Sequence, residues 1–189
     1  MSEPQTISHW IDGAISPSTS GKTAPVYNPA TGQVTANVAL ASQEEIDATI
    51  ASATKAAKTW GNLSIAKRQA VLFNFRELLN ARKGELAEII TAEHGKVLSD
   101  AMGEILRGQE VVELATGFPH LLKGAFNENV STGIDVYSLK QPLGVVGIIS
   151  PFNFPAMVPM WFFPIAIAAG NAVILKPSEK DPSAALWMA

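Results

Sequence analysis

Residues 141–175 read QPLGVVGIISPFNFPAMVPMWFFPIAIAAGNAVIL and carry no charged side chain, and KPSE follows directly at 176–179. A stretch this apolar is buried in protein or in lipid, because an exposed apolar surface of this length would promote aggregation. The fold class of the chain therefore depends on which environment surrounds these residues.

A membrane-spanning helix is the first hypothesis for this stretch. Residues 156–175 are about as long as the ~20 residues that a helix needs to cross a bilayer. Helix-interrupting residues lie inside that candidate span, at Pro159, Pro164, Gly170 and Asn171. The flanks also lack the dense Lys/Arg cluster that fixes the orientation of a membrane helix. We therefore favour burial in protein and keep a membrane anchor as an alternative.

The same stretch divides naturally into a strand, a helix and a second strand. Residues 144–149 are short, apolar and β-branched, which is typical of a strand buried on both faces. Pro155 suits the first turn of a helix that runs to about Ala169 with a kink at Pro164. Gly170 and Asn171 end that helix, and residues 172–175 form the next strand. This order predicts a βαβ unit with parallel strands and a right-handed crossover.

The rest of the chain predicts helices that cover such a sheet, and hence an α/β domain. Ser42 and Glu45 form a capping box. The apolar residues after it keep helical spacing, and we assign them to the core: Ile46, Ile50, Ala53, Ala57 and Trp60. We further predict small strands over 7–40 with a turn at 28–32, a helix capped by Ser64, a separate helix ending at Gly95, a helix capped by Ser99 and reaching Gly117, a strand or hairpin over 127–140, and a helix from about Ser183.

Composition excludes several classes of protein. The chain has 189 residues, which is enough for a substantial core. Its net charge of −3 gives no indication of a nucleic-acid partner. The N-terminus shows no secretory signal or Arg-rich transit peptide, which favours the cytoplasm. There is no cysteine and the three histidines are scattered, so we predict neither disulfides nor a metal site.

Two polar segments follow the two predicted strands, at 150–153 and 176–179. The carboxyl ends of parallel strands meet at one edge of a sheet, so the two segments form one composite site. Asn153 carries an amide that is suited to donate to a developing oxyanion. Its alternative role is that of a turn residue before Pro155.

The segment after the second strand has the groups that a nucleotide needs. Lys176 is a cation for a phosphate or ribose, and Glu179 is an acceptor for the two ribose hydroxyls that would repel a 2′-phosphate. The alternative is an ordinary helix start with Ser178 as its cap. GVVG at 144–147 does not fit G-x-G-x-x-G, so any dinucleotide is held differently from the usual Rossmann loop.

These motifs, at these intervals, resemble the aldehyde dehydrogenase superfamily: PFNFP at 151–155, Gly170-Asn171, and KPSE at 176–179. The resemblance covers the whole chain, starting from WIDG at 10–13 and NPATG at 28–32. It implies an α/β fold that is the N-terminal part of an NAD-binding domain, with a parallel sheet and flanking helices.

Within the superfamily, SPFNFPAMVPMW at 150–161 and EILRGQEVVE at 104–113 are similar to the CoA-acylating methylmalonate-semialdehyde dehydrogenases. That resemblance implies NAD-dependent oxidation of methylmalonate or malonate semialdehyde. The acyl group would leave as propionyl- or acetyl-coenzyme A with loss of carbon dioxide. Another NAD-dependent aldehyde dehydrogenase, such as a succinate-semialdehyde type, and a non-catalytic nucleotide-binding fragment are the alternatives.

The resemblance also assigns roles to individual positions. It implies that Asn153 is the oxyanion donor and that Arg107 pairs with the carboxylate of the substrate. The implied cofactor-binding residues are Ser150 and Phe152, which line the NAD site, Lys176 and Glu179, which bind the adenosine ribose, and Lys180, which flanks it. For Arg107 the residues alone allow a different role, a solvated helix ion pair with Glu104 and Glu110.

The family oxidises aldehydes through a cysteine thiolate, which this chain lacks. We therefore expect residues 1–189 to be the N-terminal part of a longer enzyme and to be inactive and poorly folded alone. The nucleophile, the rest of the cofactor fold and a second substrate arginine are expected further along. By the same resemblance, residues 127–140 would be an arm toward a partner subunit of a homo-oligomer, a tetramer.

Overall fold

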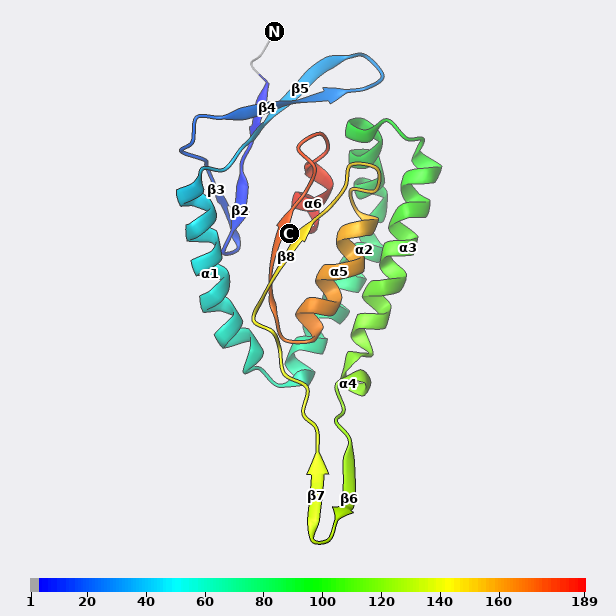
Figure 1. Cartoon of the computed structure of the whole chain (residues 1–189). Helices are drawn as coiled ribbons and strands as arrows, with labels where there is room; N and C mark the ends of the chain where they lie inside the picture. The colour runs from blue at the N-terminus through cyan, green and yellow to red at the C-terminus, as the bar shows by residue number, and fades with distance from the viewer. Residues whose placement is uncertain (1–3) are drawn as a thin grey trace.

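A parallel strand pair lies at the centre of the fold, which a computed structural model describes for residues 4–189 (Figure 1). The strands β8 (Val145–Ile149) and β9 (Ala172–Lys176) run parallel, with Val145 opposite Ala172 and Ile149 opposite Lys176. The helix α5 (Met157–Ala168) connects them. The predicted strand, helix and strand are therefore confirmed.

The apolar stretch does not form a membrane helix in the described part of the chain. Among residues 4–189, no helix is both long enough and apolar enough to cross a membrane. The helix α5 ends where the sequence predicted, because Gly170 adopts a left-handed φ of +97°. Its beginning differs: the N-cap is Ala156, so Pro155 lies before the helix and not in its first turn.

Asn171 joins the end of α5 to the beginning of β8. Its side-chain Oδ1 accepts hydrogen bonds from the backbone N–H groups of Leu143 and Gly144, at 2.7 and 3.0 Å. Its Nδ2 donates to the carbonyl of Ala166 at 3.1 Å. A buried side chain thus satisfies backbone groups from both elements, which keeps the strand start and the helix end in register.

Two long helices pack beside α5, namely α2 (Ile65–His94) and α3 (Leu98–Thr116) (Figure 1). The sequence predicted two helices over the span of α2, which is wrong. One continuous helix forms because its buried residues pack along α3 and α5 and outweigh the weak local signals between them. The predicted stop at Gly95 is confirmed, with a φ of +87°. The predicted cap at Ser99 is wrong: α3 begins right after Val97, which gives no side-chain cap.

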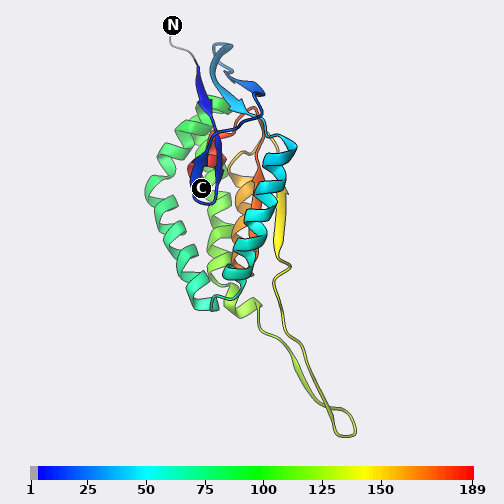
Figure 2. The ribbon, with the colours of Figure 1, turned by 90° about the vertical axis from the view of Figure 1, so that its left-hand side faces the viewer.

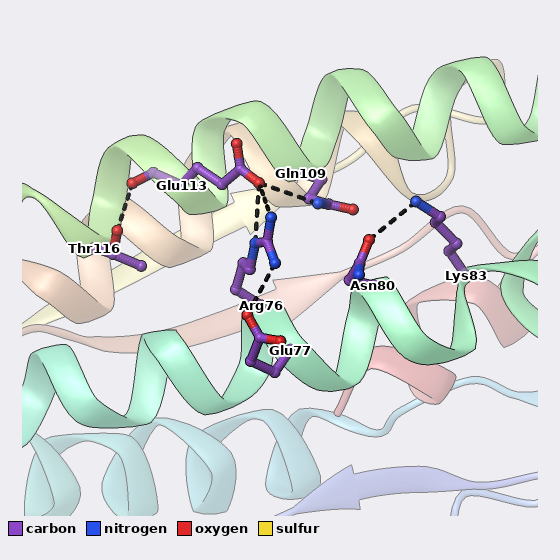
Figure 3. A network of polar contacts seen from close by, with 7 residues as sticks. All are labelled: Arg76, Glu77, Asn80, Lys83, Gln109, Glu113 and Thr116. Atoms are coloured by element: carbon purple, nitrogen blue, oxygen red, sulfur yellow. Dashed lines mark hydrogen bonds and ion pairs between the residues drawn. The ribbon is translucent and has the colours of Figure 1, made fainter.

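The core lies between these helices and α6 (Ser183–Met188). Its largest completely buried side chains include Leu79, Leu86 and Ile105. The helices α3 and α5 approach closely at Gly108, where an added Cβ would lie 3.1 Å from the Cβ of Met160. On the surface, an ion pair between Arg76 and Glu113 also ties α2 to α3 (Figure 3).

The helix α1 (Gln43–Gly61) covers the other side of the strand pair (Figure 1). The predicted capping box of Ser42 and Glu45 is confirmed. The assignment of Ile46 and Ile50 to the core is wrong, since they are 43% and 47% exposed. Near the end of the same helix, Trp60 is half-buried and its Nε1 donates to the carbonyl of Ile167.

Arg68 fastens α1 and α5 to the start of α2. Its side chain is buried, and the guanidinium donates to the carbonyls of Gly61, Leu63 and Ala168. Carbonyls at the C-terminal ends of helices have no intrahelical partner, so one cation satisfies the ends of two helices.

Short strands precede α1 along the chain. The strands β1 (Gln5–Ile7), β5 (Gln33–Ala39) and β4 (Thr23–Asn28) form a three-stranded sheet, and β2 (His9–Ile11) pairs with β3 (Ala14–Ser16). The predicted turn is confirmed by a 2.8 Å hydrogen bond from the N–H of Gly32 to the carbonyl of Asn28.

A β-hairpin projects from the body of the molecule after the short helix α4 (Phe118–Leu121) (Figures 1 and 2). Its strands are β6 (Phe126–Ser131) and β7 (Ile134–Tyr137), and every residue in them is exposed. The predicted hairpin is confirmed, and its role as an arm toward a partner subunit stays a prediction.

Candidate functional site

The two polar segments lie side by side at the carboxyl edge of β8 and β9, as the parallel topology requires. The N–H of Ser150 donates to the carbonyl of Lys176 at 3.1 Å, which extends the strand pairing into both segments. Ser150 is buried, and its Oγ has no hydrogen-bond partner among residues 4–189. A buried hydroxyl without a protein partner is unusual in a folded protein.

Phe152 and Lys180 meet at this edge. The ring of Phe152 stacks on the imidazole of His94 with centroids 4.6 Å apart and planes 19° apart. The ammonium of Lys180 lies 5.5 Å from the centre of the same ring. Burial and the nearby Lys96 lower the pKa of His94, so the stacked imidazole is neutral at pH 7.

Lys176 and Glu179 form an exposed ion pair with a Nζ–Oε2 distance of 3.5 Å. Hydrogen bonding to its own backbone N–H, and then the charge of Lys176, lower the pKa of the Glu179 carboxyl. The alternative role of this segment as a helix start is wrong. Ser178 accepts from the N–H of Lys180 within a turn, and α6 begins only at Ser183.

Asn153 lies in a loop whose backbone is held from the helix pair. Its side chain is exposed, and its carbonyl accepts a 2.9 Å hydrogen bond from the Nζ of Lys96. Lys96 also donates to the completely buried Glu104, with an Nζ–Oε2 distance of 2.5 Å. The other oxygen of Glu104 accepts from the N–H groups of Ala156 and Met157 at 2.9 and 3.1 Å. Two charged residues therefore hold both ends of the segment 153–157.

Arg107 lies one turn further along α3 from Glu104. Its Nε donates to the carbonyl of Gly103, and its Cζ lies 5.6 Å from the centre of the Phe154 ring. In residues 4–189 it forms no ion pair, so the alternative of a helix ion pair with Glu104 and Glu110 is wrong. For Glu104, the reason is that its carboxylate already pairs with Lys96. The guanidinium is left exposed beside the Asn153 loop, ready for an external anion.

A buried acid lies beneath the site. Asp181 is 1% exposed, and neither carboxylate oxygen accepts a well-formed hydrogen bond from residues 4–189. Burial raises the pKa of Asp181 to about 8, helped by the charges of Glu93 and Glu104 and opposed by Ser178 and Lys96. The carboxyl is therefore mostly protonated at pH 7.

Sequence reasoning missed the contacts of Lys96 and Glu104 with the segment 153–157. A signal was present for Glu104, which lies on the same helical face as Ala101, Ile105 and Gly108. A carboxylate on an otherwise apolar face must find a partner when that face is buried. No comparable pattern marks Lys96, which the turn after Gly95 brings into the site.

The strand edge, the loop with Asn153 and the motifs around them define the class of this protein. Residues 15–189 match the Aldehyde dehydrogenase family, and the chain belongs to that family. Malonate-semialdehyde dehydrogenase 2 of Geobacillus thermodenitrificans is 47% identical over 182 residues, which are 96% of this chain and 38% of that relative. The acylating mitochondrial methylmalonate-semialdehyde dehydrogenase of Arabidopsis thaliana is 46% identical over 98% of this chain and 31% of its own length.

Solved structures agree with these relatives. The chain aligns with the crystal structure of methylmalonate-semialdehyde dehydrogenase from Oceanimonas doudoroffii at a TM-score of 0.95 and 48% identity, covering 98% of this chain and 38% of that one. It also aligns with a Sinorhizobium meliloti protein that is provisionally named methylmalonate-semialdehyde dehydrogenase and is complexed with NAD. That alignment has a TM-score of 0.96 and 47% identity, and it covers 100% of this chain and 38% of that one. The chain thus spans 31% to 38% of the length of these relatives.

Proposed function

We propose that the chain is the N-terminal part of an NAD-dependent dehydrogenase for malonate or methylmalonate semialdehyde, which releases the product as an acyl-coenzyme A with loss of carbon dioxide. The observation that carries the proposal is the exposed guanidinium of Arg107, which forms no ion pair within residues 4–189 and lies next to the Asn153 loop. These semialdehydes combine a carboxylate with an aldehyde. An anion-binding fork beside an amide donor matches both groups.

The strand edge supports NAD as the cofactor. Glu179 offers an exposed carboxylate to the two ribose hydroxyls, and Lys176 lies beside it. Ser150 contributes a buried hydroxyl without a partner among residues 4–189, and Phe152 and Lys180 border the same edge. NAD, when bound, supplies the hydride acceptor for aldehyde oxidation. Coenzyme A as co-substrate and carbon dioxide loss follow from the resemblance and the acylating relative alone.

The roles of this chain's residues in the reaction follow from their chemistry. The amide of Asn153 donates a hydrogen bond to the oxygen of the aldehyde as negative charge develops on it. Such a donor commonly contributes about 10²–10³-fold to the rate, because the charge is greatest in the transition state. Arg107 binds the carboxylate equally in the ground state and the transition state, which makes its contribution one of binding.

The test uses the full-length protein that carries this segment. Arg107→Leu is expected to raise the KM for malonate semialdehyde by about tenfold or more, because a charge-assisted pair contributes about 1.5–3 kcal/mol. Oxidation of propanal, which lacks the carboxylate, should change less than twofold. Arg107→Lys is the matched variant, with an intermediate KM, because it keeps the charge and loses the fork. An equal loss with both aldehydes would contradict the assignment of Arg107.

A further inference from the structure

We infer that Lys96 and Glu104 are positioning residues that fix the segment 153–157, and so aim Asn153 and Arg107 at the same substrate. The inference rests on the proposed function for the roles of those two residues. Lys96 and Glu104 touch neither substrate nor cofactor in this account. They act through the backbone that they hold.

The hydrogen bonds of the pair are directed at the loop. Burying an ion pair is costly, and a well-packed apolar pair is often as stable. Here the pair satisfies three backbone groups of one short segment: the carbonyl of Asn153 and the N–H groups of Ala156 and Met157. A pair whose sole task was to join α2 to α3 would have no need of these bonds, and Arg76 with Glu113 already joins those helices on the surface (Figure 3).

The pair also determines the surroundings of Arg107. Glu104 lies three residues before Arg107 on α3, which is the spacing at which a helical ion pair would form. Because Lys96 pairs with Glu104, that carboxylate does not pair with Arg107, which forms no ion pair within residues 4–189. The ring of Phe154 then lies near both cations, 4.6 Å from the Nζ of Lys96 and 5.6 Å from the Cζ of Arg107. Cation–π attraction favours this arrangement of Arg107 and the loop.

The test separates the hydrogen bond to the loop from the burial of charge. In the full-length enzyme, Glu104→Gln keeps an oxygen for the two N–H groups of α5 and leaves Lys96 free to donate to Asn153. The double variant Lys96→Met/Glu104→Gln differs from it solely by the loss of that donor, and it leaves no unpaired buried carboxylate. The matched control is Arg76→Met/Glu113→Gln, which removes an α2–α3 ion pair remote from the loop.

The expected results distinguish positioning from stability. The double variant should lose tenfold or more in kcat relative to Glu104→Gln, since a displacement of about 1 Å can cost 10²-fold. The dissociation constant for NAD should change less than twofold, and the control should keep its kcat. If the double variant does not fold, Lys96→Arg takes its place with the same expected loss, because a planar guanidinium cannot reproduce the three directions of an ammonium group.

A double-mutant cycle gives the decisive measurement. If Lys96 acts through Asn153, adding Asn153→Ala to the double variant should lower kcat no further than Asn153→Ala alone. Multiplicative losses, or an unchanged kcat in the double variant, would overturn the inference and leave the proposed function standing. A wild-type kcat for Asn153→Ala itself would instead refute the assigned role of Asn153, and with it both proposals.

Discussion

The buried carboxyl of Asp181 should make the stability of the protein fall as the pH rises. Its folded-state pKa of about 8 lies above the ordinary value of 3.8, so the folded state holds a proton that the unfolded state releases. For an acid with a raised pKa, stability is greatest below the ordinary value and falls as the pH rises toward 8. Integrated over that range, the free energy of unfolding decreases by at most about 6 kcal/mol, and about 4 kcal/mol of this decrease falls between pH 5 and pH 8.

The perturbation that isolates this loss is Asp181→Asn. The amide does not titrate in this range, so its contribution does not change with pH. Its unsatisfied N–H groups cost roughly 1–3 kcal/mol, and this cost is equal at every pH. The diagnostic quantity is therefore the slope of stability against pH, and the absolute stability of the variant does not enter the comparison.

The assay is the thermal midpoint of the full-length protein at pH 5, 6, 7 and 8. Allowing for relaxation around the carboxyl, we expect the wild type to lose about 2–4 kcal/mol more than Asp181→Asn, or roughly 2–4 °C at about 1 °C per kcal/mol for a protein of the relatives' length. Asp100→Asn, which removes an exposed carboxyl, is the matched control and should keep the wild-type slope. Some slope should remain in Asp181→Asn, because burial also raises the pKa of Glu93. Equal slopes in wild type and Asp181→Asn would refute the reasoning.

Three further predictions test the packing and the extent of the chain. Arg68→Met should lower stability by about 3 kcal/mol, measured by the urea midpoint, because three carbonyls lose a charged donor; a change below 1 kcal/mol would contradict this. Gly108→Ala should cost about 1–3 kcal/mol in the same assay, because the Cβ of Met160 cannot move without displacing α5, while Gly103→Ala, whose added Cβ meets no atom within 4 Å, should be neutral or stabilising. The isolated segment 1–189 should show no turnover and no cooperative melting in a calorimeter, and a sharp transition would show that it folds independently.

The elements that were predictable are those whose boundaries are local. Gly170 and Asn171 end α5 through their own conformation and side chain, so β8, α5 and β9 could be recognised from the sequence. The continuity of α2 was not predictable, because it depends on packing against helices that follow it. The burial of Ile46 and Ile50 was overestimated for a related reason, since helical spacing identifies an apolar face but not what covers it.

In the candidate site, too, some contacts could be predicted from the sequence and others could not. Topology alone brought Ser150 and Lys176 to one edge, and the structure confirms that they meet there. The bond from Lys96 to Asn153 spans 57 residues and depends on the turn after Gly95, so no local pattern predicted it. The lack of an ion pair between Glu104 and Arg107 follows from a different contact, the pairing of Glu104 with Lys96, and the sequence neighbours of Arg107 suggested the opposite.

The distant cap on α5 has a consequence for the order of folding. Ala156 offers no side-chain cap, and the acceptor for the first N–H groups of the helix comes from Glu104, 52 residues earlier. The first turn of α5 therefore forms its cap only after α3 has packed against it. We expect this turn to be among the last parts of the helix to become protected against hydrogen exchange during refolding. In synthesis from the N-terminus, α3 leaves the ribosome before α5. Glu104 is therefore already synthesised when the most apolar segment of the chain emerges, so the first turn of α5 can be capped as soon as α3 docks against it.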